Sequence, residues 1–429
     1  MKKRVEKGDL KIGMSIVELD RPWLDTPFLF QHFTITNAED LAMVQSLCDY
    51  VYIDDDPAAG EAAKRRPVMA SFSKPLTSSR GTGATGMTID VNMQVPAALH
   101  SDSTVIPRYA DVVPVEEELQ KVIELESVVR EAIFTIFDDA RQGRAINVEN
   151  TRKLVAEVVE SAIRNPDALA WITQLKKKHE YTATHGLRVC MVAVMLGRHL
   201  GYDREKLNSL GTGSLLLDIG KIRIPDEILN KTTALTPTEY ELMKTHVLEG
   251  VKLLSTSSSM PQEVLDVVAR HHEHYDGSGY VTGMSGDSIG ELAMITAIVD
   301  TYDAILSDRN FRKAISNVEA MREIYKLRGG HYHPWLTEQF IQCMGIYPVG
   351  SIVEMTNGEV GVVIAINRIR RLRPRVTLTR SASGAPLRPP KDVDLMFSCD
   401  VKRQPYEIRK MLPTGTFDIN PIDYLPIKH

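Results

Sequence analysis

The clearest helix start in the chain is Thr236-Pro237-Thr238-Glu239, where three separate signals coincide. Thr236 suits the N-cap position and Pro237 suits the first helical position. Glu239 stands where a capping-box glutamate accepts a hydrogen bond from the N-cap backbone. The pattern predicts a helix that places His246 on it and runs to about Leu254.

Helical periodicity continues outward from this stretch. Apolar residues recur at three- and four-residue spacing from Val115 to about Arg141. They do so again from Glu149 to Ile163, after Asn147 as a candidate N-cap. The middle of the chain is therefore predicted to be a helical domain.

The two ends of the chain follow other patterns. Met14 to Asp20 and Tyr50 to Asp54 alternate as strands do, and residues 38–47 predict a short helix between them. Near the other end, Asn357-Gly358 separates two apolar runs and predicts a β-hairpin. We therefore expect a small α+β domain before the helices and a small β module after them.

The predicted fold class is mainly α, with the two smaller parts at its ends. Residues 58–110 are rich in Gly, Ser, Thr and Pro, a composition that forms poor cores and predicts a flexible segment. The predicted boundaries are 1–57 for the α+β domain, 58–110 for the flexible segment, 111–146 for a connecting helix, 147–345 for the helical domain and 346–429 for the β module.

Composition narrows the function classes. The 429 residues, 43% hydrophobic and 25% charged, indicate two or three globular domains. A net charge of -5 gives no general attraction to DNA, and we interpret the basic run from Arg368 to Arg375 as a solvated surface. No run approaches the roughly 20 apolar residues of a membrane span, and no signal peptide is evident. The four scattered cysteines fit a reducing compartment. We expect a cytoplasmic protein.

Polar residues interrupt apolar helices at five places: His185, residues 217–221, His246, His271-His272 and Asp300. A single histidine on a helix is usually a buried residue with an ordinary partner. Several histidines and two carboxylates buried in one domain would be costly without partners. A bound metal would satisfy all of them together.

The spacing of these residues favours two ions over one. His271 and His272 would diverge by about 100° on a helix, so a single ion would not readily take both. Imidazole and carboxylate ligands without thiolate suit iron or manganese better than a structural zinc. Two-metal sites are common in phosphodiester hydrolysis. We therefore predict two divalent transition metal ions, with iron or manganese favoured.

The order of these motifs resembles that of the HD-GYP family, from about Asn147 to Gly345. The similar segments are His185-Gly-Leu-Arg-Val189, Leu216-Leu-Asp-Ile-Gly-Lys-Ile-Arg-Ile-Pro-Asp226, Leu235-Thr-Pro-Thr-Glu239, His246, His271-His-Glu-His-Tyr-Asp-Gly-Ser-Gly-Tyr280 and Asp300-Thr-Tyr-Asp-Ala304. The first 55 or so residues resemble, more weakly, the small domain that precedes HD-GYP in one large bacterial subgroup. The resemblance implies an all-helical HD-type phosphohydrolase fold and a role in bacterial signalling.

The resemblance also implies residue roles. The implied metal ligands are His185, Asp218, His246, His271, His272 and Asp300. Asp218, the bridging ligand, and Lys221 are the implied catalytic residues. The implied substrate-binding residues are Lys221, Gly279, Tyr280, Arg309 and Arg312, and a guanidinium suits phosphate because it makes paired bonds to its oxygens. The implied reaction converts cyclic di-GMP to linear pGpG and GMP, and the base identity comes from the resemblance alone.

Three residues depart from the family's pattern. Leu217 occupies the position of the histidine in the HD pair, and leucine cannot bind a metal. Tyr181 stands where members with a third metal have glutamate, so we expect two ions at most. Val281 replaces a proline, which alters the stiffness of the loop more than its chemistry.

Leu217 leaves two hypotheses open. The retention of Asp218, Lys221 and Asp300 favours a phosphodiesterase weakened by the loss of one ligand. Leu217 itself favours an inactive regulator that binds nucleotide or partner signalling proteins. A third hypothesis, an HD-type phosphohydrolase acting on a nucleotide monophosphate, leaves His271-His272 unexplained. The sequence leaves open the signal sensed by the N-terminal domain and the oligomeric state.

Overall fold

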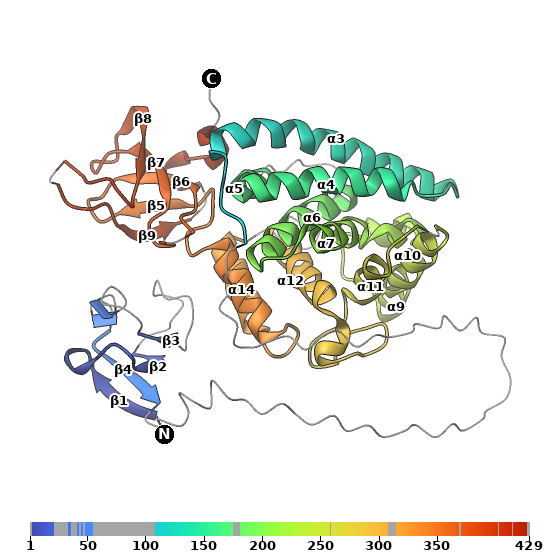
Figure 1. Ribbon diagram of the computed structural model, residues 1–429, viewed down its shortest axis with the longest axis horizontal. Coiled ribbons are helices and arrows are strands. Elements are labelled where there is room, and N and C mark those ends of the chain that lie inside the picture. Colours follow the sequence, from blue (N-terminus) through green and yellow to red (C-terminus); the bar gives the residue numbers. More distant parts are fainter. Residues whose placement is uncertain are drawn as a thin grey trace. The chain divides into compact units, whose positions relative to one another are not determined.

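The computed structural model is shown in Figure 1. It describes residues 2–20, 33–35, 41–42, 44–45, 48–54, 108–174, 181–257, 259–307, 315–368, 370–401, 403–413 and 415–426. The chain divides into two compact units, Met1–Asp102 and Ser103–His429. Most of the predicted flexible segment 58–110 and part of the predicted helix 38–47 lie outside the described residues. Among the described helices we find none with the length and apolar character that a bilayer crossing requires.

The N-terminal unit contains a four-stranded antiparallel sheet in the order β1-β4-β2-β3. Its elements are β1 (Lys2–Glu6), η1 (Lys7–Asp9), β2 (Ser15–Leu19), β3 (Phe33–Thr34) and β4 (Tyr50–Asp54). Ile16, Ile35 and Val51 are fully buried in its core. Strands β2 and β4 confirm the two strands predicted from alternation.

The second unit is mainly helical, which confirms the predicted fold class. Its helices are α3 (Val115–Arg141), α4 (Val148–Arg164), α5 (Pro166–Gln174), α6 (Tyr181–His199), α7 (Arg204–Leu216), η3 (Ile219–Arg223), α8 (Asp226–Leu229), α9 (Pro237–Lys244), α10 (His246–Ser255), α11 (Gln262–Arg270), η4 (Gly286–Ile289), α12 (Glu291–Leu306), α13 (Asn317–Lys326) and α14 (Pro334–Met344). Asn147 caps α4 by accepting from the Asn150 amide at 2.9 Å. The capping box of Thr236 and Glu239 is present at the start of α9.

One part of the helix prediction is wrong. The helix that begins after Thr236 ends at Lys244, and His246 is the first residue of a second helix, α10. Thr245 interrupts the helix because both its amide (3.1 Å) and its hydroxyl (2.7 Å) bond to Leu242 O, which tightens the turn. His246 therefore lies at a bend between two short helices.

A five-stranded antiparallel sheet follows the helices, in the order β8-β7-β6-β5-β9. It consists of β5 (Ile352–Met355), β6 (Val360–Ala365), β7 (Arg375–Arg380), β8 (Pro386–Asp394) and β9 (Ile408–Leu412), followed by η5 (Thr416–Asp418) and η6 (Pro421–Tyr424). The predicted Asn357-Gly358 turn joins β5 to β6, with Gly358 at φ +88° where glycine is favoured.

The basic run from Arg368 to Arg375 is not simply a solvated surface. Arg368 forms an ion pair with Asp167 of α5, whose side chain is 2% exposed. Arg375 pairs with Glu116 of α3 at 2.6 Å. The fully buried Trp171 of α5 also donates from Nε1 to Ile364 O at 2.9 Å. The run therefore helps to attach the β module to the helices.

Two glycines permit the close packing that positions the polar residues of the helical core. A Cβ atom added to Gly186 of α6 would lie 2.5 Å from Leu215 O of α7. A Cβ atom added to Gly220 of η3 would lie 1.9 Å from His246 O and 2.4 Å from Gly250 N of α10. Only glycine allows these backbones to approach so closely. Gly220 thereby brings the segment containing Asp218 against α10.

We expect Gly220→Ala to force η3 away from α10. Such overpacking typically costs about 1–3 kcal/mol, and it should lower the melting temperature and the metal content together. Gly330→Ala is the matched control, because its added Cβ would lie 3.6 Å or more from its neighbours, an ordinary contact. Thermal unfolding and metal analysis of both variants check this. Wild-type metal content in a folded Gly220→Ala protein would contradict the role of Gly220.

Candidate metal centre

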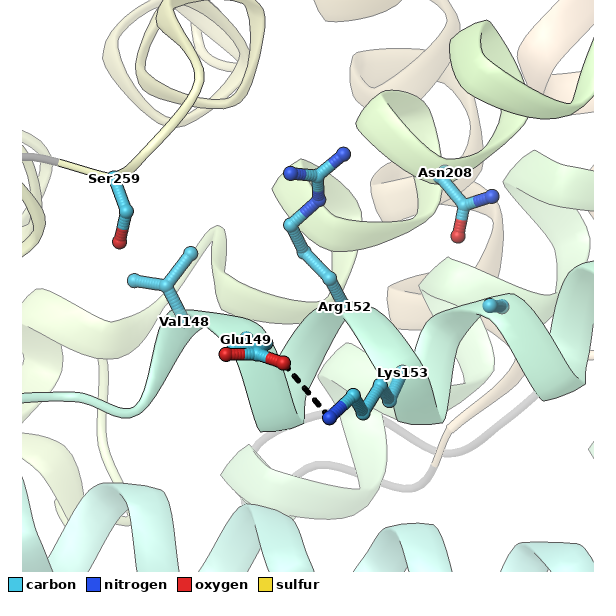
Figure 2. A pocket seen from close by; sticks show the side chains of 7 residues that line it. Val148, Glu149, Arg152, Lys153, Asn208 and Ser259 are labelled. Carbon is cyan, nitrogen blue, oxygen red and sulfur yellow. Dashed lines mark ion pairs between the residues drawn. The ribbon is translucent and has the colours of Figure 1, made fainter.

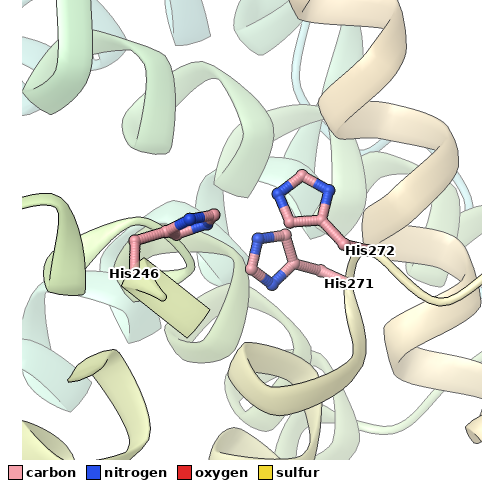
Figure 3. Close-up of side chains that lie close together, drawn as sticks. All are labelled: His246, His271 and His272. Atoms are coloured by element: carbon pink, nitrogen blue, oxygen red, sulfur yellow. The ribbon is translucent and has the colours of Figure 1, made fainter. Parts of the chain in front are cut away.

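Three histidines converge in the helical core, as Figure 3 shows. His246 begins α10, His271 follows the last residue of α11, and His272 comes next. Each offers a ring nitrogen, and these three atoms all lie within 4.8 Å of one another. The prediction that His271 and His272 diverge is wrong, because α11 ends at Arg270 and the two rings lie only 4.2 Å apart between centroids.

Backbone carbonyls fix the tautomers of two of these rings. Nδ1 of His246 lies 2.7 Å from Met243 O, and Nδ1 of His271 lies 2.9 Å from Val268 O. A carbonyl oxygen can only accept, so each Nδ1 carries the proton and each Nε2 keeps its lone pair. Both Nε2 atoms are buried and have no hydrogen-bond partner among the described residues. This is the arrangement in which histidine binds a metal.

Burial also keeps the three imidazoles neutral. It lowers the pKa of His246 to about 4 and lowers the pKa of His271. It lowers the pKa of His272 well below its usual value. Neutral imidazole is the form that binds a metal, so near pH 7 no proton competes for these nitrogen atoms.

Asp218 contributes a carboxylate to the same cluster. It lies between α7 and η3 and is 3% exposed. Burial opposes its charge, but the ammonium of Lys221, 2.6 Å from Oδ2, holds the pKa of Asp218 well below its usual range. Its Oδ1 lies 3.4 Å from His246 Nε2 and has no hydrogen-bond partner in the described part of the chain. Buried lone pairs without donors, on nitrogen and oxygen alike, fit a divalent cation.

His185 and Asp300 lie beside this cluster, as predicted. His185 Nε2 lies 2.8 Å from Asp300 Oδ1 and 3.9 Å from Asp218 Oδ2. Burial acts to lower the pKa of His185, but its bonds to Asp300 and Asp303 outweigh burial and raise the pKa to about 9. The predicted ligands therefore form one continuous group of side chains.

The sequence reasoning missed the residues that hold His185. Asp303 Oδ2 accepts from His185 Nδ1 at 2.7 Å, and Arg188 binds both oxygens of Asp303, at 2.6 and 2.9 Å. Asp303 is three residues after Asp300, and Arg188 is three residues after His185. A spacing of three residues puts both members of each pair on one face of a helix. This spacing was the signal in the sequence that could have identified Asp303 and Arg188.

A buried glutamate that was also missed shapes the loop after the histidines. Glu273 is 2% exposed and accepts from the amides of Thr282 at 2.7 Å and Met284 at 3.0 Å. A Cβ atom on Gly279 would lie 2.3 Å from His274 N, so only glycine fits there. The loop thus folds back onto the histidine cluster.

Tyr280 lies against the cluster as a result. Its amide donates to His272 O at 3.1 Å, and its ring stacks on the His272 ring with 4.7 Å between centroids and 23° between planes. The structure therefore brings Gly279 and Tyr280 to the cluster, as the sequence indicated.

The structure describes some of the remaining predicted residues and leaves others out. Leu217 follows the last residue of α7, immediately before Asp218, and is fully buried. Arg309 and Arg312 lie outside the described residues, and the side chain of Tyr181 does too. Their assignments stay predictions.

A surface hollow of about 420 Å³ lies apart from these residues, lined by Val148, Glu149, Arg152, Lys153, Ala156, Asn208 and Ser259 (Figure 2). Within it Lys153 pairs with Glu149 at 2.8 Å. It contains none of the predicted ligands, so it is no part of the candidate centre.

The chain has similarities to known proteins in both units. Residues 167–336 match the HD domain, and residues 2–151 match a domain of unknown function. Cyclic di-GMP phosphodiesterase PA4108 of Pseudomonas aeruginosa is 33% identical over 397 residues, covering 92% of this chain and 89% of that protein. The cyclic di-GMP phosphodiesterase response regulator RpfG of Xanthomonas campestris is 35% identical over 196 residues, which cover 44% of this chain and 50% of that protein. A solved structure, a protein of Bdellovibrio bacteriovorus described as HDG"Y"P, has a TM-score of 0.45 and 15% identity, covering 79% of this chain and 98% of its own.

We expect Asp303→Asn to weaken metal binding, because His185 would lose the carboxylate that orients it. Loss of such a partner typically costs 10- to 100-fold in metal affinity or activity. Glu118→Gln is the matched control, since Glu118 is also a buried carboxylate held by an arginine, with two bonds of 2.8 Å to Arg164. Metal titration followed by elemental analysis measures the effect. Equal metal affinity in Asp303→Asn and Glu118→Gln would refute the positioning role of Asp303.

Proposed function

Because the chain belongs to the HD-GYP family, we propose that it is a metal-dependent phosphodiesterase that hydrolyses cyclic di-GMP to pGpG and GMP in bacterial second-messenger signalling. The observation that carries this proposal is the convergence of two unpartnered imidazole nitrogens and one carboxylate oxygen in the protein interior. Such groups are costly to bury. The cost is offset only by a ligand that accepts their lone pairs.

A divalent ion held there would polarise a phosphoryl oxygen and lower the pKa of a water molecule toward neutrality. The ammonium of Lys221 lies 2.6 Å from Asp218 and would lie beside a phosphodiester held at this centre. Its positive charge stabilises negative charge that develops on phosphoryl oxygens. Arg309 and Arg312 would hold the substrate phosphate, as the family resemblance implies.

We assign two metal positions of unequal strength. The first comprises three neutral imidazoles, those of His246, His271 and His272, and the carboxylate of Asp218. The second comprises His185, Asp300 and Asp218, where Leu217 contributes no ligand. An ion at the second position must also displace the His185–Asp300 hydrogen bond of 2.8 Å. Imidazole and carboxylate donors favour iron or manganese at both.

The burial pattern favours the enzyme over an inactive regulator. A protein that only binds nucleotide has no need for His246 Nε2 and His271 Nε2 to stay buried without partners. The retained Asp218–Lys221 pair lies at the same place. Both features serve hydrolysis.

We expect the purified protein to contain a transition metal and to convert cyclic di-GMP to linear product. Asp218→Asn keeps the shape of the side chain but removes the charge, so the variant should lose metal. Its turnover should fall by roughly 100-fold or more, because losing a residue that only orients a ligand already costs 10- to 100-fold. Val281→Ala is the control, since Val281 is 37% exposed. Anaerobic elemental analysis and product chromatography measure both. Full turnover in Asp218→Asn would place the chemistry elsewhere.

Leu217→His should strengthen the second metal position, because it adds an imidazole one residue before Asp218. Metal occupancy and turnover should rise together by roughly tenfold. Leu216→His is the control: Leu216 is equally buried, and it is rotated by about 100° around the helix. There the imidazole lacks a partner and should only cost about 1–3 kcal/mol of stability. If Leu217→His gains neither metal nor turnover, Leu217 is no defect in the site.

A further inference from the structure

Two side chains of α9 lie beside the metal centre and have no part in the chemistry described above. Tyr240 is 46% exposed, and its ring stands edge-on to that of Tyr280, with centroids 6.5 Å apart and 76° between planes. Tyr280 in turn stacks on His272 at 4.7 Å. Two ring contacts, His272 with Tyr280 and Tyr280 with Tyr240, therefore connect a proposed metal ligand to an exposed aromatic side chain.

The short helix α9 holds Tyr240 in place without contributing to the core. None of its residues is buried. It is fixed instead by the capping box at Thr236 and by the ion pair of Lys231 with Glu239 at 2.5 Å. At its other end the Thr245 turn leads directly into His246. A helix that is held at both ends but not packed inward presents its exposed aromatic residue at a defined distance from the metal centre.

Lys244 adds a positive charge to the same place. Its ammonium lies over the Tyr240 ring, 4.8 Å from the ring centre, and over the Tyr280 ring at 5.4 Å, so a base on Tyr240 would stack beside it. It also pairs with Glu241 at 2.7 Å. An ammonium has three donors, so this contact orients Lys244 and leaves donors for a ligand.

We propose that Tyr240 and Lys244 form a purine-binding ledge that stacks one base of the cyclic dinucleotide and prefers guanine to adenine. The inference rests on the proposed function and adds the residues that recognise the base. Aromatic side chains bind bases of single-stranded nucleotides by stacking. When one phosphate lies at the metal centre, the attached base must lie a short distance outward, which is where Tyr240 stands.

The preference for guanine follows from Lys244. Guanine presents O6 and N7, two acceptors, along one edge, and lysine is a common donor to them. Adenine presents N7 with an amino group in place of O6, and that amino group is a donor. A base that stacks on Tyr240 with this edge toward the ammonium is therefore bound better when it is guanine.

The test compares substrates with and without bases, using the full chain loaded with Mn²⁺. For Tyr240→Ala we expect kcat/KM for cyclic di-GMP, relative to that for bis(p-nitrophenyl) phosphate, to fall by roughly 5- to 150-fold, mostly through KM. Tyr240→Phe should restore this ratio, because stacking needs the ring and not the hydroxyl. For Lys244→Gln the preference for cyclic di-GMP over cyclic di-AMP should fall over the same range. Leu248→Ala, with Leu248 also 46% exposed, is the control and should change neither ratio.

Equilibrium dialysis of a non-hydrolysable phosphorothioate analogue of cyclic di-GMP against the Mn²⁺-loaded chain, which measures binding without turnover, separates the two proposals. If the parent binds or hydrolyses cyclic di-GMP and Tyr240→Ala does so equally well, the ledge is wrong and the proposed function stands. If Tyr240→Ala loses both substrates in proportion, Tyr240 only supports the loop, and the ledge is wrong. An unchanged base preference in Lys244→Gln would overturn the role of Lys244. A parent that neither binds nor hydrolyses cyclic di-GMP would overturn both proposals.

Discussion

The site depends on polar atoms that are buried without partners in the protein. His246 Nε2, His271 Nε2 and Asp218 Oδ1 each lack a hydrogen bond within the described structure, although all three residues are at most 3% exposed. In both imidazoles, Nδ1 is already bonded to a backbone carbonyl. Rotating either ring to find a partner for Nε2 would break that bond. These constraints leave buried lone pairs close together, an arrangement that a bound cation would relieve.

The helix ends explain how such an arrangement forms. His246 begins α10, His271 follows α11, and Asp218 lies between α7 and η3. Residues at helix ends are not held to the angular spacing of about 100° in a helix. Side chains from separate helices can therefore converge on one point, and so can two residues that are adjacent in the sequence. The close approach at Gly220 brings these ends together, because any Cβ there would collide with His246 O. The geometry of the site is therefore set by where helices end as much as by which residues they carry.

Much of this could be predicted from the sequence, and the exceptions share a cause. The capping box at Thr236 and the Asn357-Gly358 turn are local signals, and local backbone chemistry produced both as expected. The breaks at Thr245 and after Arg270 were missed, because a side chain bonding to a backbone carbonyl and a helix ending before a pair of histidines leave no mark in hydrophobic periodicity. Asp303 was missed because its partners, Arg188 and His185, come from a helix more than a hundred positions earlier in the chain.

The distribution of unpartnered atoms also explains how Leu217 can be tolerated. At the proposed second metal position, where Leu217 supplies no ligand, His185 is bonded to Asp300 and Asp303, and Arg188 binds both oxygens of Asp303. His185 and Arg188 bond to the two carboxylates there, so these groups satisfy one another within the protein. The unpartnered nitrogen atoms belong instead to His246 and His271. Under the proposed assignment, a cation at the histidine cluster would satisfy atoms that otherwise lack partners. His185 and Asp300 already have partners within the protein, so the missing ligand at Leu217 would weaken the second metal position without leaving buried polar atoms unpaired.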